Sequence, residues 1–113
     1  MSREDDIEKI AMYYGSSCQI NQLSEECAEL SMAVSKFHRL IHNWANRMTA
    51  REVMGGLIEE IADVQLMIWQ VVLLLDCDKE IDKVIDEKID RMLRRMGDTE
   101  ERRGASDRDY SGQ

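Results

Sequence analysis

The sequence predicts an all-α protein, an antiparallel bundle of four helices per chain that is completed by oligomerisation. Two long segments repeat apolar residues at alternating steps of three and four, which is the period of packed helices. The 113 residues include no proline, which suits a helical domain. A chain of this length forms one domain. We expect a helical domain at 1–96 and a polar tail at 97–113.

The first helix is expected at residues 3–14, because Gly15 is typical of the position that follows a helix. Ser16 with Gln19 resembles a capping box that opens a second helix, which should reach about residue 42. Its predicted buried seam consists of Leu23, Cys27, Leu30, Val34, Phe37 and Ile41.

The third helix is expected at residues 50–75, opened by a capping box from Thr49 to Glu52. A turn centred near Trp44 and Ala45 would fold it back on the second helix. Its predicted seam consists of Leu57, Ile61, Val64, Ile68, Val71 and Leu75.

The fourth helix is expected at residues 78–96, with Asp78 as its N-cap. One side carries a predicted apolar stripe of Ile81, Ile85, Ile89, Met92 and Met96. After Gly97 the sequence is polar and has no helical period, so we expect that tail to be mobile.

An acidic phrase occurs twice, and each copy sets two acids three residues apart: Glu26 with Glu29, and Glu60 with Asp63. Residues at this spacing share one side of a helix. In an antiparallel hairpin the two pairs reach the same level, where four carboxylates repel. Raised pKa values, neighbouring Lys or Arg, or a bound divalent metal could compensate, and metal is the simplest of the three. Oxygen ligands without Cys or His favour Mg²⁺, with Mn²⁺ as the alternative. The competing interpretation is a solvated acidic helix face.

Charge and composition exclude several function classes. A formal net charge of −8 argues against binding nucleic acid or an anionic membrane. The apolar run at 64–75 is too short to span a bilayer. Three cysteines without a CxxC motif, and an N-terminus without an apolar signal segment, predict a reducing, cytoplasmic location.

The apolar run also predicts assembly, because three or four helices cannot cover such a segment on all sides. We expect a homo-oligomer, a dimer or a tetramer. Its interface would be a second stripe beside the seam, formed by Ile58, Leu66, Trp69 and Leu73. The alternative is that the first and fourth helices of the same chain cover this stripe.

Glu26-Cys-Ala-Glu29 followed by Glu60-Ile-Ala-Asp63 resembles the ExxE…ExxD signature of the all-α nucleoside triphosphate pyrophosphohydrolases, which include MazG-like proteins. The resemblance covers about residues 16–96. It implies Mg²⁺-dependent cleavage of a nucleoside triphosphate into a monophosphate and pyrophosphate. By position, all four acids would be metal ligands, and Glu29 or Glu25 would accept a proton from the attacking water.

The resemblance also implies a basic cluster that binds phosphates, and Lys88, Arg91 and Arg95 occupy that place. The alternative is that they pair with acidic neighbours on their own helix. The residues that bind the base are not assigned. Four side chains could stack on a base, although core or surface packing is favoured for them: Phe37, His38, Trp44 and Trp69.

Two other functions remain open from the sequence. One is a non-catalytic helical module for dimerisation or regulation, in which the acids dock a partner. The other is phosphoribosyl-ATP pyrophosphohydrolase activity, which has the same chemistry and a different substrate.

Overall fold

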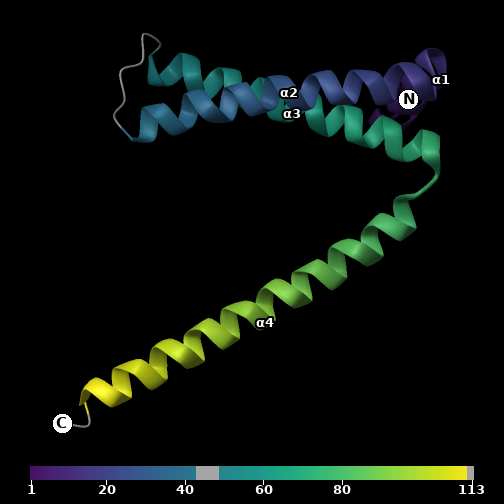
Figure 1. The fold of residues 1–113 in the computed structure, drawn as a ribbon. Helices are drawn as coiled ribbons and strands as arrows, with labels where there is room; N and C mark the ends of the chain where they lie inside the picture. The colour runs from purple at the N-terminus through teal and green to yellow at the C-terminus, as the bar shows by residue number, and fades with distance from the viewer. Residues whose placement is uncertain (43–48, 112–113) are drawn as a thin grey trace. The chain divides into compact units, whose positions relative to one another are not determined.

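The computed structural model describes residues 1–42 and 49–111 and confirms the all-α class. Within those residues there are helices and no strand (Figure 1). The chain divides into two compact units, Met1–Asp76 and Cys77–Gln113, and each is described by itself. The helices are α1 (Arg3–Tyr14), α2 (Ser16–Ile41), α3 (Ala50–Leu75) and α4 (Asp78–Ser111).

Both ends of α1 follow the local sequence. The Ser2 hydroxyl accepts a hydrogen bond from the Asp5 backbone N–H at 3.1 Å, and the Asp5 carboxylate accepts one from the Ser2 N–H at 3.2 Å. Gly15 ends the helix at φ +84°, a conformation that favours glycine. The predicted Ser16–Gln19 capping box is wrong. Gly15 is itself the N-cap of α2, so Ser16 is already helical and no side chain caps α2.

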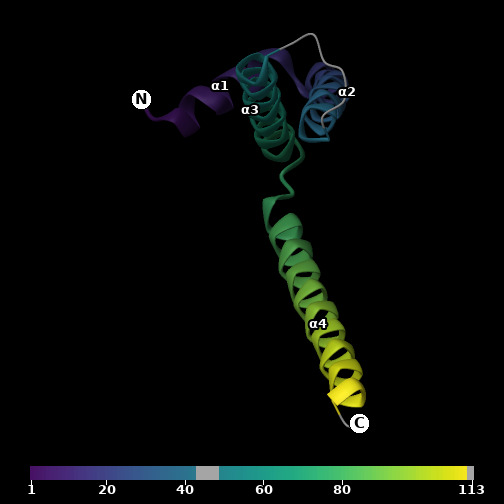
Figure 2. The ribbon, with the colours of Figure 1, turned by 90° about the vertical axis from the view of Figure 1, so that its left-hand side faces the viewer.

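The second and third helices lie side by side as a hairpin in both ribbon views (Figures 1 and 2). The Thr49 hydroxyl caps α3 by accepting from the Glu52 N–H at 3.2 Å, as predicted. The second helix ends at Ile41 and the third begins at Ala50. The predicted centre of the turn between them, Trp44 and Ala45, lies outside the described residues.

Half of the predicted seam residues are wrong. At every second seam position, the residue that is turned inward is the one directly before the predicted residue. In α2, Glu26, Ala33 and Leu40 turn toward α3 where Cys27, Val34 and Ile41 were expected. In α3, the inward residues are Glu60, Met67 and Leu74 where Ile61, Ile68 and Leu75 were expected. The other predicted seam residues are buried or half-buried. Both seams have the same spacing, so periodicity alone did not distinguish them.

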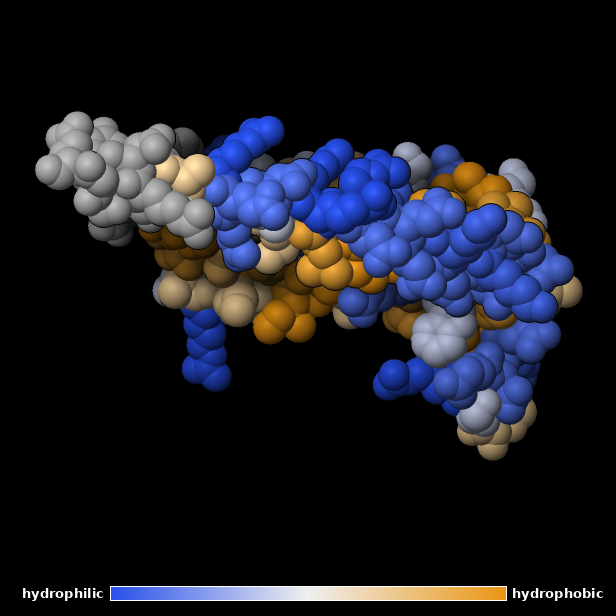
Figure 3. Space-filling model, turned by 90° about the horizontal axis from the view of Figure 1, so that it is seen from below, coloured by the Kyte–Doolittle hydropathy of each residue, from blue (hydrophilic) through white to orange (hydrophobic). Residues whose placement is uncertain are grey.

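The displaced seam leaves apolar side chains at the surface every seven residues on both helices. All of them are exposed: Ile20, Cys27, Val34, Ile41, Met54, Ile61, Ile68 and Leu75. They hold equivalent heptad positions, which flank the same side of an antiparallel pair. We call these eight residues the apolar face. Surface apolar side chains, drawn orange, are also visible between polar ones in Figure 3.

The hairpin is closed at one end by a buried polar contact. Gln19 Nε2 donates to Gln70 Oε1 at 2.6 Å, and both residues are buried. The first helix packs mainly against α3 and buries Ile7 and Ala11.

Replacing Gln70 with Leu is expected to lower the free energy of unfolding by about 1–3 kcal/mol, because Gln19 would be left buried without its partner. The double replacement Gln19→Leu/Gln70→Leu should recover much of that loss, since no buried polar group remains unpaired. Urea titrations of both variants check this pair. Equal or greater loss in the double variant would contradict it.

The fourth helix differs from expectation at both ends. Cys77, rather than Asp78, precedes the first helical residue, and its carbonyl accepts from the Ile81 N–H at 3.1 Å. The helix continues past the predicted end at Met96 to Ser111. No proline stops it, and the charged residues beyond Gly97 are mostly good helix formers. The division at residues 96 and 97, the mobility of the tail and the packing of α4 in a bundle stay predictions.

None of the helices in the described ranges combines the length and the apolarity that a membrane crossing requires.

Candidate metal centre

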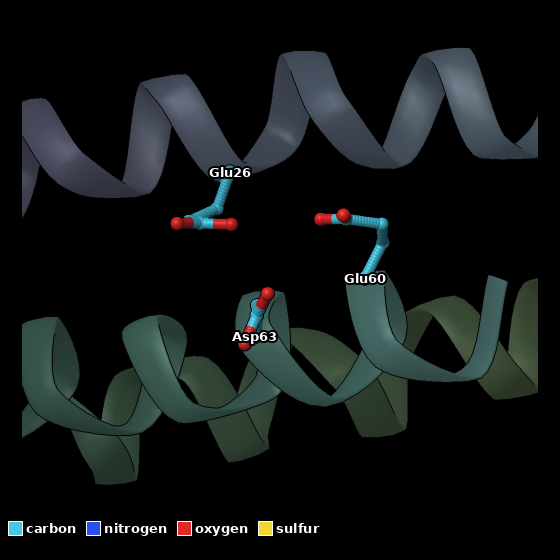
Figure 4. A group of neighbouring side chains, drawn as sticks. All are labelled: Glu26, Glu60 and Asp63. Carbon is cyan, nitrogen blue, oxygen red and sulfur yellow. The ribbon is translucent and has the colours of Figure 1, made fainter. Parts of the chain in front are cut away.

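Three acids from two helices converge inside the hairpin. Glu26 comes from α2, while Glu60 and Asp63 come from α3, and one carboxylate oxygen of each lies within 4.8 Å of the others. In Figure 4 the three side chains point toward one another between the helices. All three are half-buried, unlike the solvated acidic face that was the alternative.

The displaced seam is what brings these acids together. Glu26 and Glu60 hold seam positions of their helices, and they enter the interface between flanking apolar residues. Asp63 lies three residues after Glu60, on the same side of α3. Three of the four predicted metal ligands therefore form one cluster.

Two oxygen atoms of the cluster have unmet bonding capacity. Gln22 Nε2 donates to Glu26 Oε1 at 2.9 Å, which orients that carboxylate. The Oε2 atoms of Glu26 and of Glu60 are buried and have no hydrogen-bond partner among the described residues. A buried carboxylate oxygen without a donor is costly. A divalent cation would satisfy both atoms, and three carboxylates suit Mg²⁺ or Mn²⁺.

Glu29, the fourth predicted ligand, lies beside the cluster and is exposed. It is not one of the three residues whose oxygens lie within 4.8 Å. The negative charge of Glu26, followed by that of Glu60, raises the pKa of Glu29 above its ordinary value of 4.5. Glu29 is thus close enough to sense both charges, and its role as a ligand stays a prediction.

The raised pKa of Glu29 makes the metal-free protein sensitive to pH. The folded state holds the Glu29 proton more tightly than the unfolded state. The contribution of Glu29 to the free energy of unfolding is therefore complete below pH 4.5, and it is lost as pH rises through the raised pKa of the folded state. Without metal, Glu29→Gln should therefore melt higher than wild type at pH 7, and the two should converge near pH 4.5. Thermal melts in EDTA across this range measure the difference. A constant difference would contradict it.

A cavity adjoins the cluster between α2 and α3. It has a volume of about 230 Å³, and its lining includes Glu60 of the acid cluster and the neighbouring Glu29. Two other lining residues, Lys36 and Gly56, were not among the predicted site residues. A signal for Lys36 existed, because it follows Glu29 by seven residues and so shares its helix side.

The other predicted site residues lie apart from this cluster or outside the described residues. Glu25 is exposed. The phosphate-binding candidates Lys88, Arg91 and Arg95 are exposed on α4, and within the described chain none of them forms an ion pair, so the alternative of pairing with acidic neighbours is not seen. Their phosphate role stays a prediction.

The aromatic candidates have different surroundings. Phe37 is half-buried on the seam, as the packing interpretation predicted. Trp69 lies at the surface, 36% exposed, where it lines a pocket with Arg3 of α1. His38 is exposed, with its ring 4.1 Å from that of His42. Trp44 falls outside the described residues.

No family model, no curated protein and no solved structure matches this chain.

Proposed function

We propose that the protein is a Mg²⁺-dependent nucleotide pyrophosphohydrolase that cleaves a nucleoside or deoxynucleoside triphosphate into the monophosphate and pyrophosphate. Mn²⁺ would substitute for Mg²⁺. The observation that carries the proposal is the convergence of Glu26, Glu60 and Asp63, with two buried oxygen atoms that lack a donor. The resemblance to the ExxE…ExxD signature supplies the reaction.

The chemistry assigns different tasks to the acids. Glu26, Glu60 and Asp63 would hold the cation, which when bound neutralises phosphate oxygens and lowers the pKa of water. Glu29 would accept a proton from the attacking water, because it lies beside the acids that would hold the cation. Glu25 remains the alternative proton acceptor. The resemblance alone assigns phosphate contacts to Lys88, Arg91 and Arg95.

A substrate panel tests this function. Purified protein is incubated with the common ribonucleoside and deoxyribonucleoside triphosphates and with phosphoribosyl-ATP, and released pyrophosphate is measured with Mg²⁺ and with EDTA. The expected result is Mg²⁺-dependent release from at least one nucleotide. Absence of pyrophosphate from every substrate, with the protein folded by circular dichroism, would reject the function. Phosphoribosyl-ATP as sole substrate would select that alternative.

A second candidate, a non-catalytic module for dimerisation or regulation, is favoured by the apolar face, which needs a partner whatever the acids do. Metal binding separates the two candidates. Saturable Mg²⁺ binding that is lost in the Glu60→Gln variant supports the enzyme. A protein that binds its partner normally without the acid cluster, and that binds no metal, supports the module.

We expect a homo-oligomer, a dimer or a tetramer, in which the apolar face or the neighbouring exposed residues Ile58, Leu66, Trp69 and Leu73 are covered. Ile61→Glu/Ile68→Glu should shift the protein to monomer, because two carboxylates cannot be desolvated in an apolar interface without large cost. Light scattering after size exclusion gives the mass. The control is Glu59→Gln on the same helix, which should not change the mass. An unchanged mass in the double variant would show that the apolar face is not part of the interface.

A further inference from the structure

The cavity beside the acid cluster is placed to receive part of a ligand bound at that cluster. The two share Glu60, Glu29 beside the cluster also lines the cavity, and the cavity lies between the same two helices. Its volume of about 230 Å³ is below the roughly 300–1,000 Å³ of a pocket that encloses a whole drug-sized ligand. It therefore suits one portion of a larger molecule.

Gly56 provides the space. Gly56 of α3 and Lys36 of α2 line the cavity from the two different helices. Glycine weakens a helix interior. A Cβ at this position would meet no heavy atom within 4 Å, so close packing in the described chain does not require glycine. A side chain here would instead project into the empty volume.

Lys36 is the basic side chain of the lining. Three carboxylates line the same cavity, those of Glu29, Glu52 and Glu60. In the part of the chain that the structure describes, Lys36 nevertheless forms no ion pair. Its ammonium is thus available to an anionic group of a ligand.

The remaining walls suit a nucleoside better than a bare phosphate. Met32, Ala33 and Val53 supply apolar surface for the face of a ring. The Glu52 carboxylate can accept hydrogen bonds from hydroxyl or amino groups of a sugar or base. A bare phosphate would instead meet three like charges and a single lysine.

We propose that this cavity binds the nucleoside end of the substrate, with Lys36 contacting the phosphate attached to that nucleoside. The assignment rests on the proposed function for its orientation. Lys36 follows Glu29 by two helical turns, which is about 10 Å along α2. A cation at the acid cluster would hold the phosphate chain, Lys36 would contact the α-phosphate where the chain joins the nucleoside, and the cavity would hold the nucleoside itself.

The first test compares two neighbouring glycines. Leucine at Gly56 fills the cavity, whereas leucine at Gly55, which does not line it, makes the same chemical change outside. NMR titrations use a panel of common nucleosides and their 5′-monophosphates, with and without Mg²⁺. Wild type and Gly55→Leu should bind at least one nucleoside with similar affinity, and Gly56→Leu should bind it at least tenfold more weakly.

The second test concerns the charge. Lys36→Gln should weaken binding of the preferred monophosphate about tenfold and leave the uncharged nucleoside within twofold, while Lys36→Arg should restore most of the loss. Arg39→Gln, on the same helix and outside the cavity, is the control and should match wild type.

Two results would overturn the assignment: no nucleoside or monophosphate bound by wild type, or equal affinity in Gly56→Leu and Gly55→Leu. Both differ from failure of the proposed function, which is absence of pyrophosphate release. Uncharged nucleosides require neither the metal nor turnover, so the cavity is tested even where hydrolysis is absent.

Discussion

Replacing Glu60 with Gln is expected to lower nucleotide hydrolysis by roughly 100- to 1,000-fold, since a metal contributes several kcal/mol to transition-state stabilisation and each 1.36 kcal/mol is a factor of ten. Glutamine keeps the size of the side chain and removes its charge. Glu60 holds a seam position and its Oε2 is buried without a donor, so no solvent replaces the lost ligand. Steady-state rates with the best substrate of the panel measure the effect.

A matched control for this variant is Glu59→Gln, one residue earlier and exposed. It should keep wild-type activity, and circular dichroism should show equal helical content in both variants. Metal-free Glu60→Gln should also melt at or above wild type, because it removes one of several neighbouring negative charges. Lower stability of Glu60→Gln without metal would mean that the residue serves packing instead. Full activity in that variant would reject the metal centre.

Saturating Mg²⁺ is expected to raise the melting temperature of wild type by roughly 10–20 °C. At a free Mg²⁺ concentration of about 100 times Kd, binding to the folded state alone adds about 2.7 kcal/mol. In a domain of this size each kcal/mol corresponds to roughly 4–8 °C at the melting temperature. The cause is local, because the cation relieves carboxylate repulsion and bonds to the two oxygen atoms that lack donors. Differential scanning calorimetry with Mg²⁺ and with EDTA measures the shift.

The controls for this shift in melting temperature use other salts and one variant of the acid cluster. Equal ionic strength from NaCl should give much less than the Mg²⁺ shift, and Mn²⁺ should give a similar one. The Asp63→Asn variant should lose most of the response. The shift should increase from pH 5 to pH 7, because protons compete with the cation for carboxylates and Glu29 keeps its proton to a higher pH than an ordinary glutamate. A shift that NaCl reproduces would indicate general screening rather than a site.

Much of the helical arrangement was readable from local chemistry. Gly15 ends α1 because glycine adopts the positive φ found there, and Thr49 begins α3 because its hydroxyl satisfies a free N–H. The predicted end of α4 at residue 96 was wrong, also because of local chemistry. Charged residues without a hydrophobic period do not prevent a helix when no proline interrupts them, so Gly97 did not end it.

The acid cluster was predicted in part. Duplicated spacing and an antiparallel hairpin were sufficient to bring Glu26, Glu60 and Asp63 to one level. The exposed position of Glu29, and the cavity next to it, were not foreseen. A cavity depends on what faces each residue across the interface, and spacing along one helix carries no such information.

The residue pattern alone established the all-α class, most helix limits and the identity of the three converging acids, because caps, periods and spacings act within a few residues along the chain. Tertiary packing decided which of two equally spaced seams is buried. That choice depends on how the side chains of both helices fit at once: it placed Glu26 and Glu60 inside, left the apolar face outside, and opened a cavity between Lys36 and Gly56.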